Sequence, residues 1–125
     1  MIYGVGTDVV LIERLREMYE RHGERCLGRL LADGEREDFA SAPDPARFLA
    51  KRFAAKEAFG KALGTGVRVP ATLTAVGVTH DALGKPRFFY SPELTAHLAE
   101  LDLIAHLSLS DERDVVVAFV VMEQR

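Results

Sequence analysis

Two carboxylates and a group of cations in this sequence could together hold a divalent cation and a diphosphate. The carboxylates are Asp8 and Glu57, and the cations closest to Glu57 in the chain are Arg52, Lys56 and Lys61. A magnesium ion bound with phosphates takes one or two carboxylates from the protein, and neighbouring cations offset the remaining phosphate charge. The residue types are therefore those that a magnesium–pyrophosphate site needs, provided that the fold brings Asp8 to Glu57.

Other common catalytic and metal-binding signatures are absent. Cys26 has no second cysteine with which to build a zinc site, and the histidines have no ligand spacing: they are His22, His80, His97 and His106. The sequence contains neither a G-x-x-x-x-G-K-[ST] phosphate loop nor a G-x-S-x-G nucleophile motif.

A long helix must carry Glu57 and its neighbouring cations. Asp44 is a favourable N-cap, Pro45 suits the first helical position, and Gly64 suits the C-terminal cap. At 3.6 residues per turn, one face is apolar: it carries Phe48, Ala55, Phe59, Ala62 and Leu63. The other face has alanines between its charged residues, so a ligand or another segment could approach the backbone closely there. This face carries Ala50, Ala54, Glu57, Ala58 and Lys61.

The charged residues of this helix allow two interpretations. Glu57 and Lys61 are four residues apart, so they can form an exposed ion pair worth about 0.2–0.5 kcal/mol, or they can belong to a ligand site. Arg52 and Lys56 fall inside the apolar arc, where each must reach solvent or find an anionic partner. The pattern alone favours a solvated charged face and leaves the ligand site open.

Asp8 lies near the end of a strand predicted from Met1 to Val10, before a helix predicted from Val10 to Arg21. Local sequence allows this aspartate to be either a helix N-cap or a metal ligand. Gly4 and Gly6 are unusual inside a strand, and they mark a place where a ligand or another backbone comes close.

Five arginines gather at the start of the chain, interspersed with three glutamates: they are Arg14, Arg16, Arg21, Arg25 and Arg29. A mixed, solvated surface is the favoured interpretation, because most surface charges pair weakly with one another. A docking surface for an acidic partner is the alternative.

The remaining pattern predicts an α+β domain. Further helices are expected over residues 24–31 and 92–101, and a turn over 32–34. Strands are expected over residues 73–79, 87–90, 105–110 and 115–122, the last of them buried on both faces. Long helices mixed with hairpin-linked strands predict a largely antiparallel sheet packed against the long central helix.

Composition narrows the class of protein. The 125 residues suit a single domain, with 48% hydrophobic and 28% charged residues. A net charge of −3 argues against a general nucleic-acid binder. A lone cysteine, the lack of a signal-peptide pattern and the short apolar run of 115–122 together predict a cytoplasmic protein without a membrane span.

Two motifs together resemble those of the holo-[acyl-carrier-protein] synthases, the small bacterial class of 4′-phosphopantetheinyl transferases. The first is GVGTD at residues 4–8 with Arg14 beyond it, and the second is RFAAKEAFGKALGTG at residues 52–66. The second is highly specific, and the resemblance extends over nearly the whole chain, 1–125. It is weak only over residues 31–39, where no functional residue is expected.

The resemblance implies a reaction: the phosphopantetheine arm of coenzyme A passes to a serine of apo acyl carrier protein, releasing adenosine 3′,5′-bisphosphate. By similarity, Asp8 and Glu57 bind Mg²⁺, and these two residues and Lys61 are catalytic. Residues expected to bind coenzyme A are Arg52, Lys61, Gly64, Lys85, Pro86 and His106. Lys56 would support this set, and the general base is either Glu57 or a metal-bound water.

The resemblance also implies a homotrimer with active sites at subunit interfaces, in fatty acid biosynthesis. Carrier-protein docking is expected from Arg14, Arg21 and Arg25, with neither a nucleic acid nor a membrane as partner. Two other hypotheses stay open: a non-catalytic module that binds coenzyme A, and a purely structural oligomerisation subunit. The first predicts binding without product, and the second predicts that Glu57→Gln changes no activity.

Overall fold

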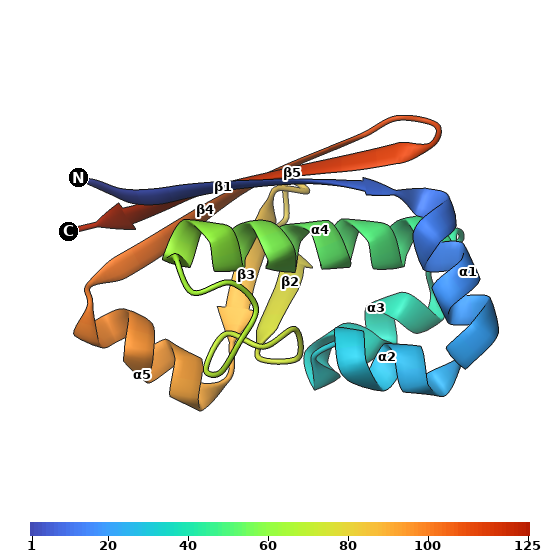
Figure 1. Ribbon diagram of the computed structural model, residues 1–125, viewed down its shortest axis with the longest axis horizontal. Helices are drawn as coiled ribbons and strands as arrows, with labels where there is room; N and C mark the ends of the chain where they lie inside the picture. Colours follow the sequence, from blue (N-terminus) through green and yellow to red (C-terminus); the bar gives the residue numbers. More distant parts are fainter.

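Two antiparallel sheets lie on either side of one long helix in the computed structural model, which describes residues 1–125 (Figure 1). The elements in chain order are β1 (Ile2–Leu11), α1 (Ile12–His22), α2 (Glu24–Leu30), η1 (Asp33–Glu35), α3 (Arg36–Ala40), α4 (Pro45–Leu63), β2 (Val76–His80), β3 (Pro86–Tyr90), α5 (Pro92–Glu100), β4 (Leu103–Asp111) and β5 (Val115–Gln124). The predicted α+β class, with antiparallel strands around a central helix, is confirmed.

Helix α4 forms where its end signals predict. The Asp44 side chain accepts a hydrogen bond from the backbone N–H of Arg47 at 3.2 Å, which caps the first turn. Gly64 ends the helix in the left-handed conformation, with φ of 92°, which an L side chain rarely adopts. These caps fix the length of the element that carries Glu57.

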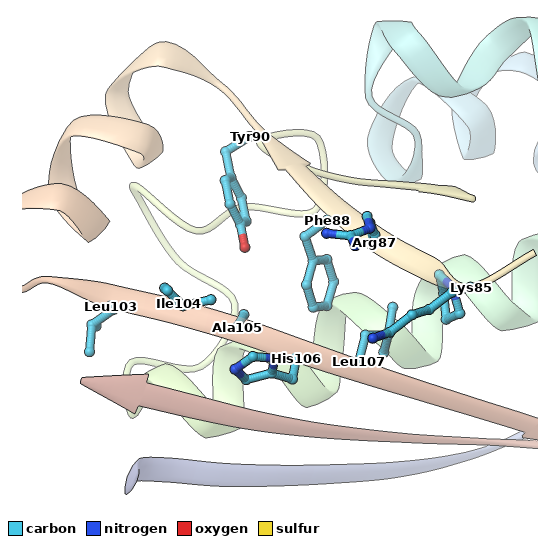
Figure 2. A pocket seen from close by; sticks show the side chains of 10 residues that line it. Lys85, Arg87, Phe88, Tyr90, Leu103, Ile104, Ala105, His106 and Leu107 are labelled. Carbon is cyan, nitrogen blue, oxygen red and sulfur yellow. The ribbon is translucent and has the colours of Figure 1, made fainter. Parts of the chain in front are cut away.

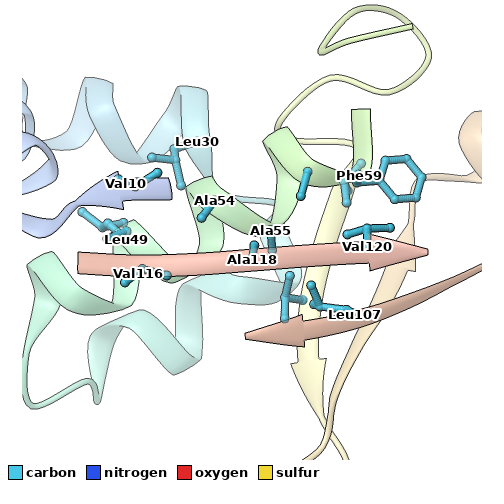
Figure 3. Packing of buried hydrophobic residues seen from close by; sticks show 14 of the residues in the cluster. Val10, Leu30, Leu49, Ala54, Ala55, Phe59, Leu107, Val116, Ala118 and Val120 are labelled. Carbon is cyan, nitrogen blue, oxygen red and sulfur yellow. The ribbon is translucent and has the colours of Figure 1, made fainter. Parts of the chain in front are cut away.

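Other elements cover most of α4 on two sides. The larger sheet, in the order β1-β5-β4, covers one side of the helix, while the β2–β3 hairpin and helices α1 to α3 lie on the other (Figure 1). Ala50, Ala54 and Ala58 are completely buried, and Figure 3 shows the neighbouring Ala55 close to the strand that carries Ala118. Three alanines of the face with small residues are therefore part of the packed core.

Strand β1 lies against the α4 backbone itself. A Cβ added at Gly6 would fall within 3.0 Å of the carbonyl oxygen of Ala58, and one at Gly4 equally close to that of Ala62. Real Cβ atoms essentially never come so close, so only glycine permits this approach. The predicted close neighbour of these glycines is thus the helix that carries Glu57.

One burial prediction is wrong. Strand β5 is not buried on both faces, because its side chains alternate: Val116, Val120 and Met122 point into the core, whereas Val117 and Phe119 are exposed. Its inner face packs against α4, and nothing in the single chain covers its outer face. Val5, Val9 and Leu11 of β1 are exposed as well, so the uncovered face is strongly apolar.

The segment after α2 holds more structure than a turn. Residues 33–40 form η1 and α3, where only a turn over 32–34 was predicted. Short helices like these lack the repeated apolar spacing that identifies longer ones.

Candidate active site

Asp8, Glu57 and Lys61 come together on one side of α4. Asp8 lies within β1, opposite Ala118 of β5, and helix α1 begins four residues later with Leu11 at its N-cap. The N-cap interpretation of Asp8 is therefore excluded. The Lys61 ammonium donates to the Thr7 carbonyl at 2.8 Å and lies 3.4 Å from Asp8 Oδ1, so the strand and the helix are joined at this point.

Burial and the neighbouring charges shift the pKa of Glu57. Burial raises the pKa of its carboxyl above the usual value, and the negative charge of Asp8 raises it further. The positive charges of Lys61 and Arg14 act in the opposite direction. The charges of the two carboxylates therefore act on each other, and a bound cation would relieve this repulsion.

Changing the neighbours of Glu57 should move its pKa in opposite directions. Asp8→Asn removes the negative charge that raises it, so the pKa should fall; Lys61→Met removes a positive charge, so the pKa should rise. Since a divalent cation binds the deprotonated carboxylate, its affinity should be lost as pH falls through this raised pKa. A ¹³C NMR titration of the glutamate side chains would check both signs, and equal shifts in one direction would contradict the arrangement.

One oxygen of the Asp8 carboxylate has no hydrogen-bond partner. Asp8 Oδ2 is buried and makes no hydrogen bond, although an unpaired buried carboxylate oxygen is costly. No third acidic, cysteine or histidine side chain lies close enough to complete a closed metal centre. Two carboxylates are what Mg²⁺ takes from a protein when waters and phosphates supply its other ligands, so the residues fit this ion.

Arg52 and Lys56 do not join this group. Both side chains are buried and face Glu35. The Lys56 ammonium donates a hydrogen bond to Glu35 Oε1, and Arg52 Nε lies 3.1 Å from Glu35 Oε2. Burial lowers the pKa of Lys56 to about 8, with the charge and hydrogen bond of Glu35 acting against it. Lys56 thus does not support the ligand set directly, and a contact of Arg52 with coenzyme A stays a prediction.

Glu35 is the residue that sequence reasoning missed. It lies within residues 31–39, the stretch with the weakest resemblance, where no functional residue was expected. The signal was indirect: two cations inside the apolar arc of α4 require an anionic partner. Glu35 is one of several acidic residues that could have supplied it, and only the fold selects it.

A second group of predicted residues meets in a cleft between β3 and β4. Lys85, Pro86 and His106 line this cleft of about 320 Å³, and Figure 2 shows Phe88 and Tyr90 beside them. His106 is exposed, and its Nε2 lies 3.0 Å from Glu123 Oε1, a hydrogen bond that lowers the pKa of Glu123. Asp8, Glu57 and Lys61 do not line this cleft, so one chain presents two separate halves of the predicted site.

The arginines of α1 and α2 border an apolar hollow. Arg14, Arg25 and Arg29 line it, with Met18 and Phe53 among its apolar residues. The Arg14 guanidinium carbon also lies 5.4 Å from the centre of the Phe53 ring, a cation–π contact. The positive charge of Arg14 acts to lower the pKa of Glu57. Arg21 is exposed but is not among the residues of this hollow, so the structure brings together only part of the predicted docking set.

Comparisons with known proteins show the family to which the chain belongs. The model of the 4′-phosphopantetheinyl transferase superfamily matches residues 4–120. A holo-[acyl-carrier-protein] synthase of Azoarcus sp. (strain BH72) is 64% identical over 125 residues, which cover 100% of both chains.

Solved structures give the same result. The holo-[acyl-carrier-protein] synthase from Neisseria meningitidis has a TM-score of 0.96 and 49% identity, with 99% of this chain and 100% of that chain covered. The one from Bacillus anthracis str. Ames, in complex with CoA (3′,5′-ADP), has a TM-score of 0.83 and 32% identity over 100% of this chain and 99% of that chain. The chain is therefore an enzyme of the 4′-phosphopantetheinyl transferase superfamily, and within it belongs to the holo-[acyl-carrier-protein] synthases.

Proposed function

We propose that this protein transfers the 4′-phosphopantetheine arm of coenzyme A to a serine of apo acyl carrier protein, with Mg²⁺ as cofactor, in the cytoplasm and in the service of fatty acid biosynthesis. The observation that carries this proposal is that Asp8, Glu57 and Lys61 lie on the same side of α4. Asp8 is 53 residues from Lys61 along the chain, and Glu57 is 4 residues from it. The names of its relatives support the same reaction.

The reaction is a phosphoryl transfer. The serine oxygen forms a bond to the β-phosphorus of coenzyme A, the bond from that phosphorus to the bridging oxygen breaks, and adenosine 3′,5′-bisphosphate leaves. Asp8 and Glu57 would hold the Mg²⁺, which supplies positive charge against the pyrophosphate when bound. Lys61 has an exposed ammonium beside Asp8 and would hold a pyrophosphate oxygen. The serine proton has to reach a base, and Glu57, with its raised pKa, is a suitable acceptor.

The decisive experiment measures the intact mass of an apo acyl carrier protein after incubation with coenzyme A, Mg²⁺ and this protein. The carrier should gain the mass of one phosphopantetheine group, and chelation of the metal should prevent the gain. Coenzyme A binding without product would instead support a non-catalytic module. A purely structural subunit would give neither coenzyme A binding nor a mass gain, and its Glu57→Gln variant would behave like the wild type.

A homotrimer with shared sites would unite the two halves of the site. The apolar outer face of β1 and β5 is the surface that a neighbouring chain would cover, and Val9, Val117 and Phe119 lie on it. A neighbour could then place its β3–β4 cleft, with Lys85 and His106, against the Asp8–Glu57 pair. Coenzyme A would bind between the two chains.

Phe119→Glu should disrupt this assembly without unfolding the chain. The side chain is 44% exposed in the single chain, so a charge is tolerated there, but it would be buried without a partner in an interface. Analytical ultracentrifugation should show the variant as a monomer with arm-transfer activity lost. Glu112→Gln on the exposed β4–β5 turn is the control, and a Phe119→Glu protein that sediments like the wild type would disprove the interface.

Arg25→Glu should weaken use of the carrier protein by about tenfold in kcat/KM while leaving the KM for coenzyme A nearly unchanged, because charge steering raises the association rate of oppositely charged partners. Arg25 tests docking better than Arg14, whose charge also reaches Glu57. Steady-state kinetics with each substrate varied in turn would separate the two effects. Arg125→Glu makes the same change of charge far from this hollow, and an equal loss there would rule out a local docking surface.

A further inference from the structure

A single buried carboxylate ties four segments of the chain together. Glu35 of η1 is 0% exposed, and its two oxygens accept hydrogen bonds from the backbone N–H groups of Ala32 and Val78, each at 2.9 Å. Lys56 of α4 donates to the same carboxylate and, at 2.6 Å, to the Leu30 carbonyl. The end of α2, the η1 turn, strand β2 and helix α4 therefore meet at one side chain.

Glu35 holds α4 at two points. Arg52 and Lys56 are one helical turn apart on one face, and the Glu35 carboxylate lies against both. Two contacts spaced along the axis fix both the rotation of the helix about that axis and its position along it. The Lys56 hydrogen bonds are directional, and they do this more strictly than apolar contacts, which allow a helix to slide or turn. The Arg52 contact is an ion pair, and its Nε makes no hydrogen bond.

Helix α4 is held on its other side by β1. The glycines of β1 lie against the α4 backbone, and Lys61 donates to the Thr7 carbonyl. Glu57 directly follows Lys56, so its direction relative to Asp8 depends on the rotation that Lys56 fixes. A site of this kind tolerates about 10–20° of misorientation before its geometry is lost.

Stability alone is a weak reason for such a cluster. A buried ion pair can often be replaced by apolar residues of similar size without loss of stability, because burying the charges costs about as much as their attraction returns. The cluster here even carries two cations for one carboxylate. What it supplies that packed methyl groups would not is a fixed direction for the helix.

We propose that Glu35 is a positioning residue for the metal site, acting through Lys56 to hold α4 in the rotation that turns Glu57 toward Asp8. The inference rests on the proposed function of Asp8 and Glu57 as metal ligands. Glu35 touches neither the ion nor the substrate, so its removal should act on metal affinity and on kcat, with little change in the KM for either substrate.

The test measures the affinity for Mn²⁺ alone by EPR, on folded protein well below its melting temperature. Lys56→Met and Glu35→Gln should each weaken Mn²⁺ binding by at least about tenfold, the usual effect of losing an outer partner of a metal site. Lys56→Met leaves Glu35 paired with Arg52, so it decides the question if the Glu35→Gln protein does not fold.

Arg47→Met is the matched control for a purely structural effect. Arg47 joins the start of α4 to the β4–β5 turn, donating to Asp111 Oδ2 at 2.6 Å and to the carbonyls of Glu112 and Arg113. Its loss should lower the melting temperature and leave Mn²⁺ affinity unchanged. A Lys56→Met protein that behaves the same way would overturn the proposal.

Asp8→Asn separates this proposal from the proposed function. If Asp8→Asn loses Mn²⁺ binding and Lys56→Met does not, only the positioning role fails. If Asp8→Asn binds Mn²⁺ as tightly as the wild type, the metal site itself is wrong and the role of Glu35 falls with it.

Discussion

Asp8→Asn should slow arm transfer to acyl carrier protein by at least about a hundredfold, because removing one preorganised electrostatic contact from a transition state typically costs that much. Asparagine keeps the shape of the side chain and one oxygen for Lys61, so the sheet should form as before. The charge that would hold the cation is lost. Single-turnover transfer, followed by intact mass, and circular dichroism on the same sample would measure the two effects separately.

Glu13→Gln provides the control for this variant. Glu13 is an exposed carboxylate of α1 that pairs with Arg16, and such surface pairs contribute little. Its transfer rate should match the wild type. Full activity in the Asp8→Asn protein would end the assignment of Asp8 as a metal ligand.

Gly6→Ala should lower the free energy of unfolding by about 3 kcal/mol, at the upper end of what overpacking costs. The added Cβ would lie 2.8 Å from the Ala62 nitrogen and 2.9 Å from the Lys61 Cβ, besides its clash with the Ala58 carbonyl. Backbone atoms cannot move aside as a flexible side chain can, so β1 must shift away from α4. Urea denaturation would give the free energy.

The same change should impair catalysis in the molecules that stay folded. Asp8 is two residues from Gly6 in β1, and a displacement of about 1 Å in a catalytic group can cost a hundredfold in rate. Gly28→Ala is the matched control: its Cβ would meet only the Arg36 guanidinium, at 3.9 Å, and alanine is about 0.5–1 kcal/mol better than glycine inside a helix. A Gly6→Ala protein as stable as the wild type would show that β1 is not so tightly placed.

The sequence predicted best those features that are set by neighbouring residues. The limits of α4 follow from Asp44, Pro45 and Gly64, and each takes the predicted position because capping depends on local backbone geometry. The start of α5 follows in the same way from Ser91, whose hydroxyl accepts from the Leu94 N–H. Such signals need no knowledge of the rest of the fold.

Features set by distant residues were not accessible in this way. The role of Asp8 stayed open in the pattern, since an aspartate before a helix suits a cap as well as a ligand, and only its register opposite Ala118 in the sheet excludes the cap. Glu35 gave no sign of binding Lys56, 21 residues away. The period-two exposure of β5 was hidden because both of its faces are apolar, so alternation could not be seen in residue type.

The bare apolar face of β1 and β5 bears on how the protein behaves at low concentration. Such a surface is tolerated in water only at a cost, so separated chains would tend to adhere to one another or to any other hydrophobic surface. If each working site is assembled from two chains, specific activity should decline on dilution, since mass action then favours separated subunits. Enzyme made in small amounts would therefore be limited by the encounter of its own copies.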